Sequence, residues 1–159
     1  MKKEEEKLLM YGLGFIAAYI LIIKPILVKI GLLEDEARLK TEERKKTQIQ
    51  TQIDESAKTQ KQTKTDQEFQ VIADQIYEDL RYSAISDNKS DAAYQVARVK
   101  NDTDLWILYK YFAKRREYLF GLPSGSLQDL SQFINSNLST SVINQINKNY
   151  QSKNIKFRF

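Results

Sequence analysis

The sequence predicts an all-α protein in three parts: an N-terminal transmembrane helix, a polar helical or disordered spacer, and a small five-helix C-terminal domain with a short terminal strand. Two observations predict this class. An apolar run near the N-terminus has the length of a membrane span, and apolar residues recur at helical spacing through the C-terminal half. The predicted boundaries are a charged N-terminus at 1–7, a transmembrane helix at 8–30, a spacer at 31–67 and a helical interaction domain at 68–159.

The apolar run, residues 8–28, is long enough to cross a bilayer. A helix over these 21 residues measures about 31 Å, which matches the hydrocarbon core. Twelve of the residues are Leu, Ile, Phe or Val, and their insertion gains on the order of 6 kcal/mol. Lys24 lies near the end of the run, where its side chain can extend to the headgroups, and Pro25 predicts a kink. The residues assigned to the anchor are Leu13, Phe15, Ile16, Ile20, Leu21, Ile22, Ile23, Lys24 and Pro25.

Two other interpretations of this run are a soluble core helix and a cleaved signal peptide. Residues 8–23 show no polar stripe, which argues against a core helix, and no small-residue cleavage site follows, which argues against a signal peptide. Gly14 and Ala18 form a pair of small residues that lets two such helices approach closely, so the chain is a candidate homo-oligomer. Lys and Arg are more numerous after the run than before it, which favours a cytoplasmic location for the rest of the chain.

The spacer is polar along its whole length. Residues 34–67 contain no aromatic residue, no glycine and no proline, and their only large aliphatic residues are Leu39, Ile49 and Ile53. The first half is rich in helix-forming residues and is expected to continue as a helix. The second half, rich in Thr, Gln and Lys, is too polar to form a core of its own. We therefore expect a segment that holds the C-terminal domain away from the bilayer.

The C-terminal domain is predicted from apolar spacing and from turn signals between the helices. Its most apolar helix is the third, for which Asp102 or Thr103 is the expected N-terminal cap. The segment at 121–126, "GLPSGS", is predicted as a loop. The predicted helices lie at 69–80, 92–99, 105–113, 127–138 and 142–150.

Two short segments of this domain are candidate partner contacts. Lys114, Arg115 and Arg116 are expected at the end of the third helix, where they either complement the helix dipole or contact lipid headgroups or nucleic acid. The tail at 154–159 alternates Ile155, Phe157 and Phe159 with basic residues, which is strand periodicity. This tail either folds back over the core of its own domain or adds a strand to the sheet edge of a partner.

Composition excludes several kinds of chemistry. The 159 residues carry a net charge of +4 and include neither cysteine nor histidine. Disulfides and thiolate metal sites are therefore excluded, and the commonest general base is absent. Lys and Arg are spread evenly along the chain, unlike the basic patch of a dedicated nucleic-acid binder. Composition thus predicts no bound cofactor and no dedicated nucleic-acid binding.

The order of elements resembles one annexin-type repeat. The resemblance is carried by "IYEDLRYSAISDNKSDAAYQVARVKNDTDLWILYKYF" at 76–112 and by "LQDLSQFINSNLS" at 127–139. The glycines of the annexin calcium loop are absent from "AISDNKSD", so the resemblance implies no calcium ligands here. Similar degenerate repeats occur in structural proteins of phages that infect Bacteroidetes-type hosts, which implies a structural role in a virion.

The predicted function is a non-catalytic structural protein that tethers a membrane to a protein partner. Its most concrete form is a virion component of a lipid-containing phage, which links the inner membrane to the capsid. One alternative is an adaptor of an envelope complex in the bacterial inner membrane. The other is an anchored, muramidase-like hydrolase, for which paired carboxylates are required. The acidic residues available for that chemistry are Glu78, Asp79, Asp87, Asp91 and Glu117.

Overall fold

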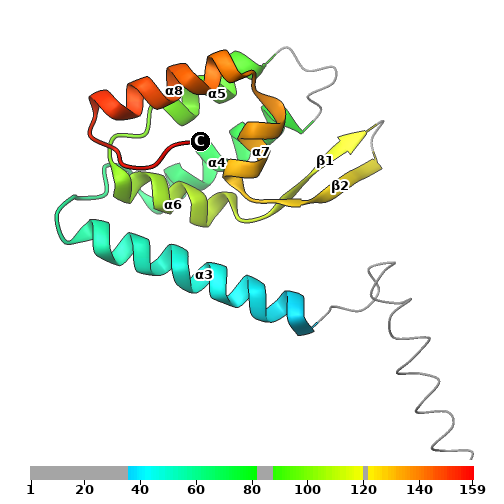
Figure 1. The fold of residues 1–159 in the computed structure, drawn as a ribbon, viewed down its shortest axis with the longest axis horizontal. Coiled ribbons are helices and arrows are strands. Elements are labelled where there is room, and N and C mark those ends of the chain that lie inside the picture. Colours follow the sequence, from blue (N-terminus) through cyan, green and yellow to red (C-terminus); the bar gives the residue numbers. More distant parts are fainter. Residues whose placement is uncertain (1–35, 82–87, 120–121) are drawn as a thin grey trace, which may run out of the picture. The chain divides into compact units, whose positions relative to one another are not determined.

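The computed structural model describes residues 36–81, 88–119 and 122–159. The described residues form helices and one antiparallel strand pair (Figure 1), so the mostly helical prediction is confirmed for them, whereas the strand pair was not predicted. The helices are α3 (Glu36–Ala57), α4 (Asp66–Leu80), α5 (Lys89–Ala97), α6 (Asp102–Phe112), α7 (Leu130–Asn137) and α8 (Thr140–Ser152). The strands are β1 (Arg115–Leu119) and β2 (Leu122–Gln128).

All residues assigned to the membrane anchor lie outside the described residues, as do Gly14 and Ala18. Among the helices at 36–81, 88–119 and 122–159, none is both long and apolar enough to cross a membrane. The anchor therefore stays a prediction from the sequence. The chain divides into two compact units, Met1–Lys45 and Lys46–Phe159, and the features below belong to the second unit.

The core of the second unit forms where the apolar faces of α4 to α8 meet. In α4 the buried residues are Phe69, Ala73, Ile76 and Leu80, at the spacing of one helix face. Thr65 caps this helix in a capping box with Glu68, which satisfies two backbone N–H groups of the first turn. In α6 the apolar spacing selects Leu105, Leu108 and Phe112 as one face, and all three are fully buried.

The N-terminal cap of α6 differs from the prediction. Asn101, and neither Asp102 nor Thr103, accepts a hydrogen bond from the backbone N–H of Asp104, at 2.9 Å. Asp102 and Asp104 instead direct their carboxylates toward other parts of the chain. The prediction was wrong because several residues here can cap a helix, and tertiary partners decide among them.

Residues 122–126 of the predicted loop belong to strand β2 of an antiparallel pair instead, and Gly121 lies outside the described residues. β1 pairs with β2 in antiparallel register, with Glu117 opposite Ser124 and Tyr118 opposite Pro123. The backbone N–H of Tyr118 donates to the carbonyl of Arg81 at 2.8 Å, which fastens the hairpin to the end of α4. The next helix consequently starts at Leu130, after an Asp129 cap, rather than at 127.

Both ends of the second unit also differ from expectation. The unit begins at Lys46, inside the predicted spacer, because Ile49 and Ile53 of α3 pack against the core. At the other end, residues 155–159 form no strand, so the predicted terminal strand is wrong. The alternation itself is real, since Ile155, Phe157 and Phe159 pack against the core of their own domain.

Candidate functional site

Two buried carboxylates lie at the beginning of α6. Asp102 and Asp104 are only 7% and 1% exposed. A buried charge is costly unless it is hydrogen-bonded, and both carboxylates accept hydrogen bonds from distant segments. The N-terminal end of this 11-residue helix also favours negative charge.

Asp104 binds the chain segment that leads from α3 to α4. Its Oδ1 atom accepts a hydrogen bond from the backbone N–H of Thr63 at 2.8 Å, and its Oδ2 atom accepts one from the Thr63 hydroxyl at 2.6 Å. Nearby, the side-chain amide of Asn101 donates to the carbonyl of Lys61 at 2.9 Å. The end of the predicted spacer is therefore fixed to the start of α6.

Asp102 joins the same segment to the C-terminal tail. Its Oδ1 atom accepts from the backbone N–H of Lys156 at 2.8 Å, and its Oδ2 atom accepts from the Gln60 amide at 3.3 Å. The side-chain oxygen Oε1 of Gln60 in turn accepts from the backbone N–H of Asp102 at 2.9 Å. We call this set the α6 junction; its residues are Gln60, Thr63, Asp102, Asp104 and Lys156.

Sequence reasoning missed the α6 junction. Acidic residues in the first turn of a helix are expected for the helix dipole alone, and capping and solvation are a sufficient local explanation of Asp102 and Asp104. Gln60 and Thr63 belong to a stretch that reads as a polar linker. Thr63 and Asp104 lie 41 residues apart in the sequence, so local patterns cannot show that they are in contact.

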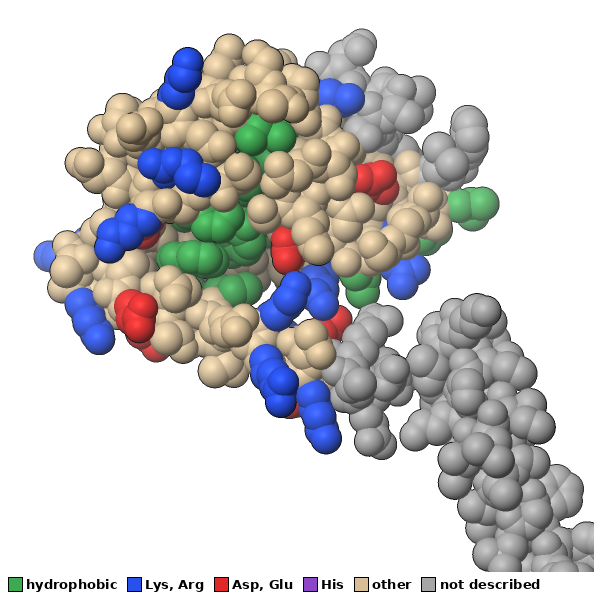
Figure 2. Space-filling model, viewed as in Figure 1, with side chains coloured by type: hydrophobic (Ala, Val, Ile, Leu, Met, Phe, Trp, Pro, Cys, Tyr) green, Lys and Arg blue, Asp and Glu red, His purple; other side chains and the backbone are tan. Residues whose placement is uncertain are grey.

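The C-terminal tail lies across α6 and α8. Ile155 is 1% exposed, and the Phe157 ring meets the rings of Trp106 and Tyr109 edge-on at 5.6 and 5.4 Å. Figure 2 shows apolar side chains gathered in a hollow of the surface, in the region where Figure 1 places α6 and the C-terminus. The tail therefore covers an aromatic surface and leaves part of it accessible.

Two tyrosines beneath the tail are held in the neutral form. Burial raises the pKa of Tyr109 and of Tyr150 well above the ordinary value of 10.0. The Tyr150 hydroxyl donates to the carbonyl of Val96 at 2.9 Å, so it serves as a structural hydrogen-bond donor. Neither phenol is suited to act as a base at neutral pH.

The predicted basic contact residues have different surroundings. Arg115 and Arg116 belong to β1 rather than to the end of the third helix. The Arg115 guanidinium forms an ion pair with Asp74 at 2.6 Å and donates to the carbonyl of Phe112 at 2.9 Å, so it serves the end of α6. Arg116 is exposed, and Lys114 is half-buried. On the face in Figure 2, Lys and Arg side chains are distributed rather than gathered in one patch.

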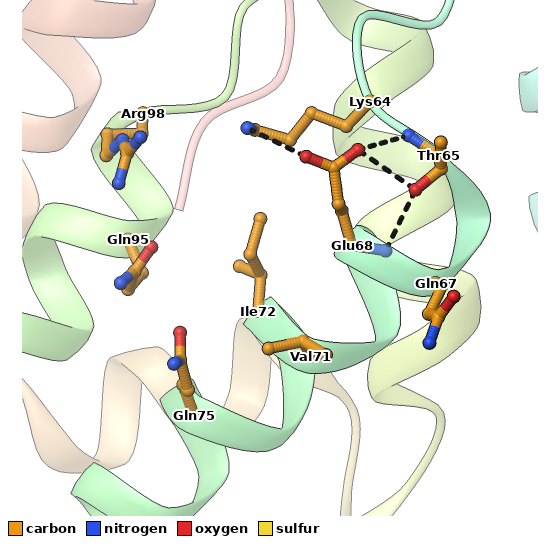
Figure 3. A pocket seen from close by; sticks show the side chains of 9 residues that line it. All are labelled: Lys64, Thr65, Gln67, Glu68, Val71, Ile72, Gln75, Gln95 and Arg98. Atoms are coloured by element: carbon orange, nitrogen blue, oxygen red, sulfur yellow. Dashed lines mark hydrogen bonds and ion pairs between the residues drawn. The ribbon is translucent and has the colours of Figure 1, made fainter.

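A shallow polar groove lies between α4 and α5 (Figure 3), with a volume of about 510 Å³. Its carboxylate, Glu68, is engaged in the capping box and lies 3.9 Å from the ammonium of Lys64. Thr65, hydrogen-bonded to Glu68, is its only hydroxyl-bearing residue. The groove offers no pair of carboxylates, so it does not suggest hydrolytic chemistry. Its lining residues are Lys64, Thr65, Gln67, Glu68, Val71, Ile72, Gln75, Gln95 and Arg98.

The acids considered for hydrolysis do not converge on a catalytic arrangement in the described part of the chain. Glu117 accepts hydrogen bonds from the amides of Asn137 at 3.0 Å and Gln128 at 3.5 Å, so its carboxylate is held by these two side chains. Glu78 is paired with Arg81 at 2.7 Å.

Asp79 has its pKa raised, first by burial and then by the charge of Asp91. Asp87 lies outside the described residues. Within residues 36–81, 88–119 and 122–159, no group of three or more acidic side chains is placed to hold a metal ion.

Comparisons with protein-family models, curated proteins and solved structures found no match. The resemblance to an annexin-type repeat, and the virion role that it implies, therefore stay predictions from the sequence.

Proposed function

We propose that this chain is a non-catalytic, membrane-anchored tether. The apolar run at 8–28 would hold it in a bilayer, and the compact unit at Lys46–Phe159 would bind a protein partner. The ten residues of α3 that precede Lys46 would separate the two, since they span about 15 Å as a helix. Apart from Leu39, the described side chains of this part of α3 are polar, which suits a solvated spacer.

The observation that carries the proposal is the α6 junction. A tether has to transmit load from its anchor to its binding domain without unravelling the connection between them. Here the segment that follows α3 is fastened to buried carboxylates by the backbone and hydroxyl of Thr63 and by the amide of Gln60. Hydrogen bonds to ionised groups are about twice as strong as neutral ones. Load arriving along α3 would therefore reach the core at α6.

The partner of the tether defines two versions of this function. In a lipid-containing phage the compact unit would meet capsid proteins, and in a bacterial envelope it would meet subunits of a membrane complex. Purified particles distinguish them, because a virion component is present at a fixed copy number per particle and an envelope adaptor is absent from particles.

The anchor is tested by replacing Ile16 and Ile20 with Asp in the full chain and separating membrane from soluble fractions. Each central carboxylate costs about 3 kcal/mol of insertion free energy, so the two together offset the whole gain of about 6 kcal/mol on insertion. We expect the Asp variant to appear in the soluble fraction, and a matched variant with Leu at both positions to remain with membranes. An Asp variant that stays membrane-bound would contradict the anchor.

The non-catalytic part of the proposal has a separate test. The full chain is embedded with bacterial cell wall in a gel and renatured. We expect no cleared band, and a band that disappears in a Glu117→Gln variant would contradict this part and favour the hydrolase.

A further inference from the structure

The tail at 155–159 is bound as a peptide ligand is bound. It forms no strand, and its backbone is held by side chains of two helices. The side chain of Asn147 on α8 forms two hydrogen bonds with the backbone of Phe159. Its amide nitrogen donates to the Phe159 carbonyl at 3.1 Å, and its oxygen accepts from the Phe159 N–H at 3.0 Å. Asp102 of α6 accepts the N–H of Lys156. These contacts hold the backbone of the tail at Lys156 and at Phe159, near its two ends.

Side chains add specificity to this backbone recognition. Ile155 fills a fully enclosed position, while Phe157 contacts Trp106 and Tyr109 edge-on. Phe159 lies against Tyr150 at 5.9 Å between ring centroids. The groove formed by α6 and α8 is therefore matched to a peptide with apolar residues at alternate positions. Among the described residues, Arg158 donates hydrogen bonds only to the carbonyls of Ile155 and Phe157, so these contacts stay within the tail when it exchanges.

The connection between α8 and the tail is short. α8 ends at Ser152, and Asn154 has a φ of 57°, the left-handed conformation in which asparagine often ends a helix. The N–H groups of Asn154 and Ile155 donate back to the carbonyls of Gln151 and Tyr150. Straightening this turn would release the left-handed residue and direct the tail away from its own groove.

We propose that residues 155–159 exchange between two copies of the chain, each tail occupying the groove of the other. A second copy is the occupant that the structure favours, because its tail carries the very sequence that the groove holds. Exchange preserves the contacts of Asn147, Asp102 and Trp106 and changes only the turn at Asn154. Exchange of an identical element between two copies is a low-cost route to a dimer, since every contact of that element is formed again. The proposal does not rest on the membrane anchor.

The absence of cysteine from the chain allows a direct test. Two differently tagged full-length variants, Asn147→Cys and Phe159→Cys, are purified in detergent, mixed at high concentration and oxidised. Exchange places the two thiols of different copies side by side, so we expect a disulfide-linked heterodimer. Gln145→Cys, on the exposed side of α8, is the matched control and should give little heterodimer with Phe159→Cys.

The hinge provides a second measurement on the otherwise unchanged chain. Asn154→Ala strains the closed turn, and Asn154→Gly relaxes it. We expect the dimer fraction, measured by sedimentation, to be about fivefold higher for the Ala variant than for the Gly variant. Dimers formed by the anchor helices would not respond to position 154 and would link positions 145 and 147 equally. Equal linking at 145 and 147, or equal dimer fractions for Ala and Gly, would overturn the exchange.

Discussion

α3 and α8 are attached to the same core by different forces. α8 buries a stripe of Ile143, Ile146 and Tyr150 along its 13 residues. α3 contributes only the half-buried Ile49 and Ile53, and the segment after it is held by the hydrogen bonds of the α6 junction. The difference teaches that apolar burial holds the domain together, whereas polar contacts fix where the chain enters it.

The magnitudes of the two kinds of attachment explain this division. Full burial of an isoleucine side chain contributes about 1.5–3 kcal/mol, and it requires no particular direction of approach. A hydrogen bond to a charged group contributes about 1.5–3 kcal/mol, but only at one distance and angle. Asp102 and Asp104 therefore fix the segment after α3 in one position on the core. For a tether, a fixed point of attachment matters more than additional stability.

The largest expected effect tests the comparison directly with one substitution on each helix. Ile146 on α8 is only 2% exposed, so Ile146→Ala leaves a cavity in the core. We expect this substitution to lower the free energy of unfolding by about 2–5 kcal/mol. Ile53→Ala on α3 removes the same atoms from a half-buried site and should cost about 1 kcal/mol. Urea denaturation measures both. Equal losses would show that α3 is as much a part of the core as α8.

The next effect concerns the α6 junction. Asp104→Ala removes the acceptor of the N–H and hydroxyl of Thr63, and we expect a loss of about 1.5–3 kcal/mol, the range for a hydrogen bond to a charged group. Asp104→Asn keeps one acceptor oxygen and should lose about half as much. Hydrogen exchange over residues 58–65 should rise in the Ala variant while exchange in α8 stays slow. Unchanged exchange over 58–65 would contradict the role of this carboxylate.

A smaller effect is expected from the one polar contact of the α8 stripe. Tyr150→Phe removes the hydroxyl that donates to the carbonyl of Val96, and it keeps the ring that packs in the core. We expect a loss of about 1 kcal/mol, much less than that of Ile146→Ala. Thermal unfolding followed by circular dichroism measures the difference. A loss as large as that of Ile146→Ala would mean that hydrogen bonding, rather than apolar burial, holds α8.

The smallest effect is a pH dependence at the start of α4. Hydrogen bonds from the backbone and hydroxyl of Thr65 lower the pKa of Glu68 from its ordinary value of 4.5. The ionised form is favoured in the folded state, so this contribution is present above pH 4.5 and is lost as the pH falls through the lowered pKa.

Glu68→Gln keeps an acceptor oxygen but does not titrate, and we expect it to lose less stability on acidification than the unsubstituted chain. Denaturation in urea at about pH 7 and about pH 3 measures this. An identical loss in both proteins would show that the capping box contributes no pH dependence.

Elements with a clear apolar period were predictable from the sequence. α4 and α8 have one buried face each, and the inward residues of α6 follow directly from their spacing. The alternation of Ile155, Phe157 and Phe159 identified the inward side of the tail, although the tail forms no strand. Its backbone is paired with the side chains of Asn147 and Asp102, which periodicity does not reveal.

Two features were not predictable because tertiary contacts decide them. The hairpin contains a glycine, a proline and two serines in β2, residues that normally indicate a loop, and it is fastened by Tyr118 to the end of α4. The α6 junction joins residues that resemble a linker to residues that resemble ordinary helix caps. A polar linker explains Gln60 and Thr63, and helix capping explains Asp102 and Asp104. Neither pattern therefore predicts that the two segments are in contact.

Hydrogen exchange of the full chain, measured with and without lipid vesicles, tests the tether most directly. We expect residues 8–28 to exchange slowly only when lipid is present, and α8 to exchange slowly under both conditions. The polar first half of α3 should exchange quickly in both. Protection of residues 8–28 that is the same without lipid would mean that this segment is buried against protein, and the account of a membrane-anchored tether would be wrong.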